Sequence, residues 1–298
     1  MAVAQKLNEE YISEKVEELP TLPTIVYELT QVINDPMSST KDVESIMEND
    51  QAMTTKVLKL VNSAYYAIPG GVSNLARAIG YIGFDTVNQL VLASSIVDAL
   101  KVSGPTKFDM NAFWQHSVGV AMASETIAKA VNHPIPSDLF TAGLIHDMGK
   151  IALYVIDDNS LVELVDFAKA KEMSYVEAEM ELGYPPHTAI GSLLSKKWRL
   201  PLAMKACIEF HHEKNPNLRR DLTPELNQAV DIVYFANLLT HALKFGDSGH
   251  DKVIGVPKDV MERLGIDPDQ GFKSVARDVK ASLSKAEDFI RAINGEDA

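Results

Sequence analysis

The sequence has one cysteine among 298 residues, Cys207, so no disulfide can form within the chain. The opening residues, MAVAQKLNEEYISEKVEELP, lack the basic-then-apolar order of a signal peptide. The sequence also lacks any run of roughly 18 to 20 consecutive apolar residues, the length that a membrane-spanning helix needs. These absences predict a cytoplasmic protein without a membrane partner.

Basic residues are scarce relative to acidic ones, since 28 Lys and Arg stand against 41 Asp and Glu and give a formal net charge of −13 at pH 7. The long-range field of such a chain repels nucleic-acid backbones and anionic lipid surfaces. We therefore expect no nucleic-acid partner, while a local basic pocket for a small phosphate stays open. Hydrophobic residues make up 46% of the chain, which is enough for a sizeable core.

Patterns typical of β-strands are missing as well, because no stretch alternates apolar and polar residues between tight hairpin turns. Apolar residues instead recur at three- and four-residue steps, which predicts an all-α fold. The stretch KVSGPTKFD, residues 101–109, separates two helical halves. We divide the chain into an N-terminal helix (1–17), a first helical subdomain (18–104), a second helical subdomain (105–246) and a C-terminal extension (247–298).

Periodicity and turn residues place the expected helix boundaries. In the first half, a short helix over 74–82 precedes a long one over 84–102. In the extension, residues 257–293 are expected to form one or two exposed helices rich in charged side chains. The helices expected in the second subdomain cover about 109–132, 137–157, 160–172, 174–182, 187–199, 201–213 and 224–245.

Five histidines and one aspartate fall on or beside apolar faces of these helices: His116, His146, Asp147, His187, His211 and His212. A single buried histidine most often donates only one hydrogen bond inside a core. Burying so many polar groups singly would cost on the order of 1 to 3 kcal/mol each if unpaired, whereas convergence on one or two cations satisfies them all. Imidazole and carboxylate ligands suit divalent Fe, Mn, Zn, Co or Ni rather than Ca.

Two charged residues of the segment AGLIHDMGK are suited to further roles, one in metal binding and one in phosphate binding. Asp147, next to a histidine, can bridge two ions, an arrangement used for attack on phosphate esters. Lys150 follows one turn later, where its ammonium could meet a phosphate oxygen, although an ordinary surface lysine explains the position equally well. The remaining histidines, His133, His241 and His250, lie near helix ends or in loops and are expected at the surface.

The order of these residues resembles the ligand series of the HD phosphohydrolase superfamily, through the motifs HSVGVA, LIHDMGK, PHTAIGSLL and EFHHE. The first half resembles the N-terminal half of the HDOD domain, an HD-related output domain of bacterial signalling proteins. The stretches that carry this second resemblance are LPTLPTIVYELTQVINDP, IMENDQAMTTKVLKLVNSAYY and LARAIGYIGFDTV. Together with KKWRLP at residues 196–201, the resemblance covers about residues 18 to 242.

The resemblance implies an all-helical fold of two packed subdomains, the second with an HD-type core, and a regulatory rather than an enzymatic role. It also implies which residues bind metal or phosphate, because seven residues match such positions in the dinuclear HD-GYP phosphodiesterases. These residues are His116, His146, Asp147, Lys150, His187, His211 and His212.

Two departures from the HD-GYP pattern count against catalysis. Asn237, in YFANLLTH, stands where the family has an aspartate, and an amide binds a divalent cation more weakly than a carboxylate. The GYP signature expected after the paired histidines is missing, since EKNPNLRRD stands there. A GYP does occur at Gly183–Pro185, but it precedes His187 and is expected to be a turn.

Three hypotheses follow. The first is a bacterial signal-transduction module of the HDOD type that acts through contacts with signalling proteins, with one or two metal ions or a small phosphorylated ligand at its HD site. The second is a metal-dependent phosphohydrolase acting on a nucleotide or cyclic dinucleotide, in which Asp147 and Lys150 would be catalytic. The third is a purely structural helical domain without a ligand.

Overall fold

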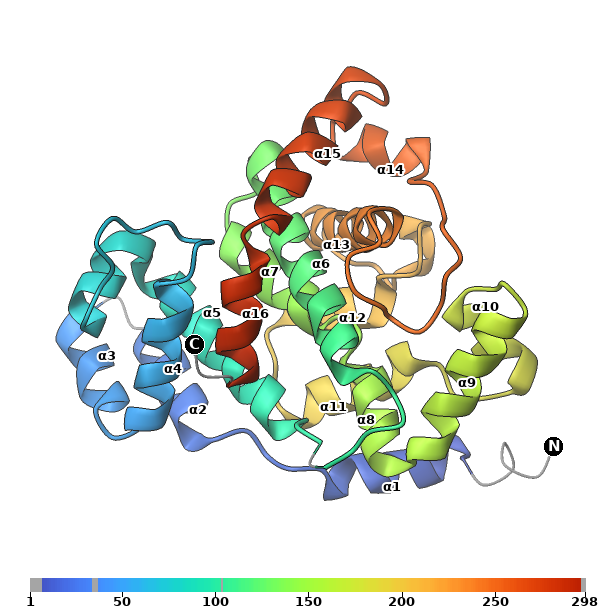
Figure 1. Cartoon of the computed structure of the whole chain (residues 1–298), viewed down its shortest axis with the longest axis horizontal. Coiled ribbons are helices and arrows are strands. Elements are labelled where there is room, and N and C mark those ends of the chain that lie inside the picture. The colour runs from blue at the N-terminus through green and yellow to red at the C-terminus, as the bar shows by residue number, and fades with distance from the viewer. Residues whose placement is uncertain (1–6, 34–36, 103, 296–298) are drawn as a thin grey trace. The chain divides into compact units, whose positions relative to one another are not determined.

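The computed structural model describes residues 7–33, 37–102 and 104–295, and every regular element among them is a helix (Figure 1). The predicted all-α fold is confirmed. The chain divides into two compact units. The first takes the chain up to Pro20 together with Val102–Lys280, and the second takes Thr21–Lys101 together with the chain from Ala281. Each unit thus combines two stretches, whereas the segments predicted from the sequence are each continuous.

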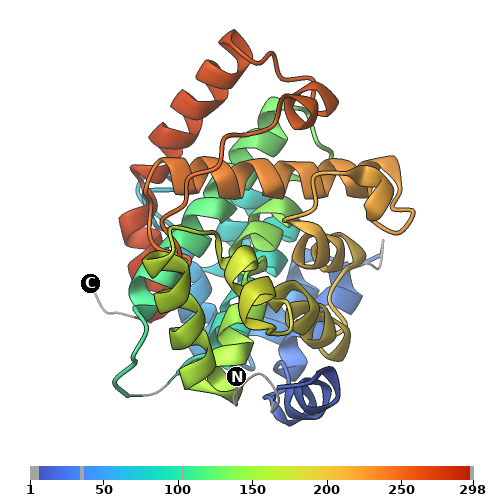
Figure 2. The same cartoon turned by 90° about the vertical axis from the view of Figure 1, so that its right-hand side faces the viewer.

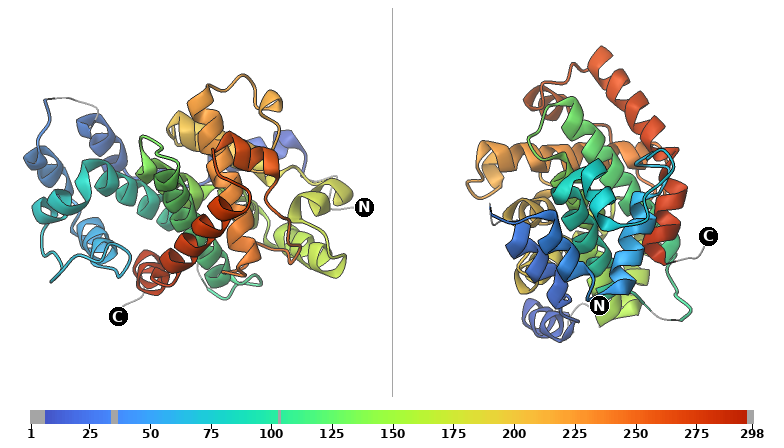
Figure 3. Two further views of the ribbon diagram at one scale, coloured as in Figure 1. Left: turned by 90° about the horizontal axis from the view of Figure 1, so that it is seen from above. Right: turned by 90° about the vertical axis from the view of Figure 1, so that its left-hand side faces the viewer.

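Among the described residues, five helices lie wholly in the second unit, and Figure 3 draws the chain from two further sides. These helices are α2 (Thr24–Ile33), α3 (Thr40–Met47), α4 (Gln51–Val61), α5 (Leu75–Ala99) and α16 (Ala286–Asn294). Helix α5 is interrupted at Gly83, whose φ of +82° is left-handed and favours glycine. The break falls between the two helices expected at 74–82 and 84–102. Phe289 of α16 is fully buried and its ring packs edge-on against Tyr65.

The first unit holds the remaining helices, and the long α6 lies at its centre with α13 crossing it (Figure 2). Most of α6 is buried, including His116. The helices of this unit are α1 (Glu9–Glu18), α6 (Met110–Ala130), α7 (Pro136–Ile145), α8 (Met148–Ile156), α9 (Asp158–Ala170), α10 (Tyr175–Leu182), α11 (His187–Lys197), α12 (Leu202–Phe210), a 3-10 turn (Pro216–Leu218), α13 (Pro224–Ala242), α14 (Lys258–Arg263) and most of α15 (Gln270–Leu283).

The single helix expected over 137–157 is wrong, because the chain turns at His146 and Asp147 between α7 and α8. The stretch Pro136–Ile156 is apolar enough to cross a membrane by length and composition, but 89% of its most apolar window is buried inside the protein. It is therefore a core element. Asp147 occupies the position before α8 without bonding the helix N-terminus, so its carboxylate is available elsewhere.

Helix α1 packs on α11, and two side chains at the end of α11 fix the segment that follows α1. Lys197 donates to the carbonyls of Val16, Glu17 and Leu19, at and just beyond the end of α1, where helix carbonyls lack their full set of helical partners. The indole of Trp198 donates to the carbonyl of Pro20 over 2.9 Å. The KKWRLP motif therefore anchors the N-terminal helix to the first unit.

The C-terminal extension contains three helices with apolar sides that are buried, rather than one or two exposed helices. Val260, Val279 and Phe289 are each fully buried. Before them runs a loop, residues 247–254, which we call the strap and which extends from α13 toward α10 (Figure 1). The expectation of an exposed surface is wrong for these residues, because their helical periodicity carries an apolar face as well as many charges.

Candidate metal centre

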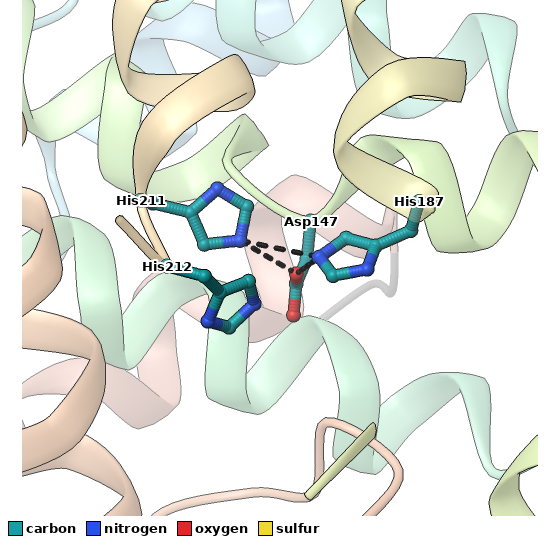
Figure 4. Close-up of side chains that lie close together, drawn as sticks. All are labelled: Asp147, His187, His211 and His212. Atoms are coloured by element: carbon teal, nitrogen blue, oxygen red, sulfur yellow. Dashed lines mark hydrogen bonds and ion pairs between the residues drawn. The ribbon is translucent and has the colours of Figure 1, made fainter. Parts of the chain in front are cut away.

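The structure gathers the six predicted histidine and aspartate residues around the turn between α7 and α8. Two groups share Asp147: one with His116 and His146, the other with His187, His211 and His212. Figure 4 shows the second group. Within each group the potential ligand atoms all lie within 4.8 Å of one another. The helices that supply them are α6, α11 and the end of α12.

Asp147 lies at short range from three imidazole rings. Its Oδ1 is 3.2 Å from Nε2 of His187 and 3.3 Å from Nε2 of His211, and its Oδ2 is 3.3 Å from Nε2 of His146. All four residues are at most 1% exposed. Because water does not reach them, the polarity of the cluster has to be satisfied from within or by a bound ion.

The tautomers of these three rings follow from their hydrogen bonds. Nδ1 of His146 lies 2.7 Å from the carbonyl of Gly143, and Nδ1 of His211 lies 3.0 Å from the carbonyl of Ile208. Nδ1 of His187 lies 2.9 Å from Oε1 of Glu179. Carbonyl and carboxylate oxygens only accept, so each Nδ1 carries the proton in the neutral ring and each Nε2 presents its lone pair to Asp147.

This arrangement places acceptors against acceptors. Nε2 of His187 and Nε2 of His211 are 3.3 Å apart, so in these neutral tautomers the two lone pairs face each other. Three more buried atoms of the cluster are without hydrogen-bond partners within the described residues: Nε2 of His146, Oδ1 of Asp147 and Nε2 of His212. A cation placed among these lone pairs removes the repulsion and satisfies the orphaned atoms together, so the residues fit a divalent transition metal.

The protonation states also suit metal binding. Burial lowers the pKa of His211 to about 4, although Asp147 opposes the shift, and burial holds the pKa of His116 and His212 well below their usual range. Burial alone would raise the pKa of Asp147, but His146 and Lys150 outweigh it and hold that pKa well below its usual range. At neutral pH no proton therefore has to be displaced from these groups. His187 is the exception in direction, since its burial is outweighed by Glu179 and Asp147, which raise its pKa.

Gly149 sets the distance between α8 and α11. A Cβ atom at this position would lie 1.9 Å from the carbonyl oxygen of His187, which no side chain tolerates. The glycine therefore allows the first turn of α8 to touch the start of α11. This backbone contact brings Asp147, at the start of α8, to His187, the first residue of α11.

Lys150 is buried beside the carboxylate rather than exposed at the surface. Its Nζ donates to Oδ2 of Asp147 over 2.7 Å and to the carbonyl of Ser248 over 3.0 Å, and it lies 4.5 Å from the centre of the Tyr175 ring. The side chain is 2% exposed. The surface-lysine interpretation is wrong, and contact with a phosphate stays a prediction.

Asn237 lies beside the first ligand group. Its Oδ1 is 3.1 Å from Nε2 of His116, and the residue projects from α13, which packs across α6. The amide oxygen is thus near the place where a carboxylate is expected in HD-GYP phosphodiesterases. Its role as a weak ligand stays a prediction.

Sequence reasoning missed three residues next to this centre. Glu179, buried on α10, accepts from the Nδ1 and from the backbone N–H of His187. His241 lies with its ring centre 5.3 Å from that of His116 and stacks on His250 at 4.1 Å. The expected surface position is wrong for His133 and His250, which are buried, and for the half-buried His241.

One of these three residues, His241, could have been found from its spacing in the sequence. His241 follows Asn237 by four residues and therefore lies one turn further along the same face of α13. Glu179 lies on a different helix from His187, and His250 lies in the strap, so neither has a helical spacing to any ligand.

A pocket of about 210 Å³ opens next to the centre. His212, Asn237 and His241 line it from the helical core, and His250 and Lys252 line it from the strap. Lys252 is held in place by both carboxylate oxygens of a glutamate on α10, each at 2.7 Å.

Comparison with known proteins places this fold and cluster in a family. The family model of the HDOD domain matches residues 19–214, which is more than half of the chain. The chain belongs to the HDOD family. Asn237, His241 and the strap lie beyond the matched residues of this HDOD protein.

Solved structures share the HDOD fold over nearly the whole chain. An HDOD domain protein of unknown function from Geobacter sulfurreducens has a TM-score of 0.70 and 24% identity, with 97% of each chain covered. A candidate signal transduction protein from Marinobacter aquaeolei VT8 has a TM-score of 0.72 and 22% identity, covering 96% of this chain and 60% of that one.

A candidate phosphohydrolase from Shewanella amazonensis SB2B also shares the fold, with a TM-score of 0.69 and 24% identity over 95% of this chain and 97% of that one. Among curated proteins, an uncharacterised protein of Treponema pallidum (strain Nichols) is 22% identical over 91% of this chain. The chain spans about half the length of that relative, 51%.

Proposed function

We propose that the chain is a regulatory HDOD module of signal transduction, which binds one or two divalent ions of Fe, Mn or Zn at the His/Asp cluster and acts through contacts with signalling proteins. The observation that carries this proposal is the burial of four residues of the cluster, which lie away from both the solvent and the adjacent pocket. His146, Asp147, His187 and His211 are at most 1% exposed, and none of them lines the adjacent pocket. A ligand in that pocket meets the cluster through His212 and Asn237.

The residues of the cluster would form two sets of metal ligands that share one carboxylate. His187, His211 and His212 would hold an ion with Asp147, and His116 and His146 would hold another with the same carboxylate. Bound divalent ions supply positive charge for an anion and Lewis acidity toward phosphate esters. Asn237, an amide in place of a carboxylate, weakens the second position and favours binding over turnover.

Metal analysis tests this proposal directly. Protein purified without added metal should carry at least one transition ion per chain, and His146→Ala and Asp147→Ala should lose it while staying folded. Wild-type protein that carries no ion and takes up neither Mn, Fe nor Zn on reconstitution would contradict the proposal.

A second candidate function is a metal-dependent phosphohydrolase acting on a nucleotide or cyclic dinucleotide. It is favoured by the sharing of Asp147 between two ligand groups, which is the arrangement of two-ion phosphoesterases. Lys150 beside that carboxylate would then hold a phosphate oxygen. Metal-loaded protein incubated with phosphodiesters and phosphomonoesters separates the two functions, since turnover that His212→Ala abolishes would replace the regulatory proposal.

A further inference from the structure

His212 differs from the other histidines of the two ligand groups in how its ring is held. In His116, His146, His187 and His211, one ring nitrogen lies within 3.1 Å of an oxygen atom. The ring of His212 makes no hydrogen bond among the described residues, and its buried Nε2 is without a partner there. The position of this ligand therefore depends on the backbone that carries it.

Two arginines hold the backbone directly after His212. Nε and Nη2 of Arg219 donate to the carbonyl of Glu213 over 2.9 and 2.6 Å. Nη2 of Arg263 donates to the carbonyl of Lys214 over 2.9 Å. These two carbonyls belong to the residues that follow His212 beyond the end of α12, where regular helical bonding stops. The guanidinium groups thus fix a segment that has no helical hydrogen bonds of its own.

Asp231 on α13 holds both arginines. Its Oδ1 accepts from Nη2 of Arg219 over 2.6 Å and from Nη2 of Arg263 over 2.9 Å, and its Oδ2 accepts from Nε of Arg263 over 2.7 Å. Asp231 is 1% exposed and Arg219 is fully buried, whereas the side chain of Arg263 is 30% exposed. We call these three residues the arginine clamp.

The clamp is better suited to fixing geometry than to adding stability. A buried ion pair contributes little net stability, because the cost of removing its charges from water offsets their attraction. The donors of a guanidinium form a rigid planar fork, so a two-point contact with a carboxylate defines both distance and orientation. Arg263 contacts Asp231 in this two-point manner while its third nitrogen bonds Asp259 on the same helix.

The clamp brings the C-terminal extension to the metal centre. Arg263 is the last residue of α14, which Val260 and Met261 anchor in the first unit with 0% and 6% exposure. Arg219, Asp231 and Arg263 all lie beyond residues 19–214, the stretch that the HDOD family model matches. The ligands lie inside that stretch, so residues outside it hold one end of the ligand set.

We propose that the arginine clamp positions His212 as a metal ligand, and that α14 is therefore part of the metal centre although its residues belong to neither ligand group. Arg219, Asp231 and Arg263 are positioning residues that act through the backbone after His212. The inference rests on the proposed function, since it requires that the cluster hold an ion.

Arg263→Gln in the full chain tests the proposal. The guanidinium that it removes is partly exposed, and Arg219 stays paired with Asp231, so the chain should fold. Its affinity for Zn²⁺, measured by competition with a chromophoric chelator, should fall about tenfold or more, as for other residues that orient a ligand. The matched control is Arg277→Gln on α15, an exposed arginine that bonds Asp278 and Ser274, and it should keep the wild-type affinity.

A second background separates positioning from a general loosening of the unit. His212→Ala keeps Asp147, His187 and His211, and there Arg263→Gln should leave the affinity nearly unchanged, because the ligand that the clamp positions is gone. Histidine ring signals in the NMR spectrum of the metal-free protein give an independent readout. In Arg263→Gln the signals of His212, assigned by their loss in His212→Ala, should shift or broaden while those of His146 stay in place.

The outcomes distinguish this inference from the proposed function. A chain that takes up no metal overturns both. In a chain that binds Zn²⁺, equal affinities of Arg263→Gln and Arg277→Gln overturn the clamp alone, and so does an equal loss from Arg263→Gln in the wild-type and His212→Ala backgrounds. If His212→Ala takes up no ion, unchanged ring signals of His212 in Arg263→Gln overturn it.

Discussion

His187 donates from Nδ1 to Oε1 of Glu179 over 2.9 Å, and its Nε2 consequently faces Asp147 at 3.2 Å. Burial opposes a charged His187, but Glu179 and Asp147 outweigh it and raise the pKa of this imidazole. The ring is thereby held by a carboxylate on each side. A carboxylate behind a ligating histidine fixes its orientation and raises its basicity toward a metal.

Replacing Glu179 with Gln should weaken metal binding. The amide keeps the shape but removes the charge behind His187, so we expect the affinity for a divalent ion to fall by about 10- to 100-fold. Competition with a chromophoric chelator measures this change. Glu181→Gln, an exposed position on the same helix, is the control. Equal affinities for the two variants would contradict a positioning role of Glu179.

Replacing Gly149 with Ala should destabilise the first unit. The new methyl group would lie 1.9 Å from the carbonyl of His187, so α8 and α11 must separate. We expect a loss of about 3 kcal/mol or more in the free energy of unfolding, at or above the upper end for overpacking. Urea unfolding followed by circular dichroism measures it, and metal uptake should fall in parallel.

The control for this change is Gly80→Ala. Gly80 lies in α5, and a Cβ there has no neighbour within 4 Å. Alanine in a helix interior is favoured over glycine by about 0.5 to 1 kcal/mol, so this variant should be as stable as the wild type or more so. Equal behaviour of both variants would show that the contact between α8 and α11 is not tight.

The stability of the metal-free protein should fall as the pH decreases from about 6.5 to 5. Burial lowers the pKa of His211 and His241 to about 4 and that of His250 to about 3, whereas the ordinary value of an unfolded histidine is 6.5. The unfolded chain therefore binds protons first as the pH falls, and it gains stability relative to the folded chain. His187, with its raised pKa, opposes the trend in part.

Urea midpoints measured at pH 7, 6 and 5 test this expectation in a window above the ordinary titration of carboxylates. His250→Gln removes one of the depressed groups and should give a shallower decline than the wild type. A midpoint that stays constant from pH 7 to 5 in metal-free protein would contradict the burial of neutral histidines.

The sequence predicted much of the fold because helical periodicity is a local property. Gly83 separates two helical patterns, and the structure breaks α5 at that residue. The turn at His146 and Asp147 was not predicted, because apolar residues continue with helical spacing on both sides of it. The packing of α8 against α11, which Gly149 allows, joins distant segments and leaves no periodicity in the sequence.

The candidate site likewise contains residues that the sequence predicted and residues that it did not. The residues that were found lie on helices or directly at helix ends, where apolar faces predicted burial, and burial of imidazoles indicated metal. His250 was expected at the surface because the strap has no periodicity. Its burial comes from its stacking on His241 and from strap contacts such as that of Lys252 with Glu177 on α10. Contacts between distant segments leave no pattern in a single sequence.

The position of the strap along the chain separates two properties of the site. Every histidine and aspartate of the two ligand groups lies between His116 and His212, inside the stretch matched by the family, whereas His241, His250 and Lys252 lie beyond it. Substitutions in α13 and the strap can therefore reshape the lining of the pocket next to the cluster and leave the candidate metal ligands unaltered. If the cluster holds ions as proposed, the metal and the pocket can vary independently along the chain.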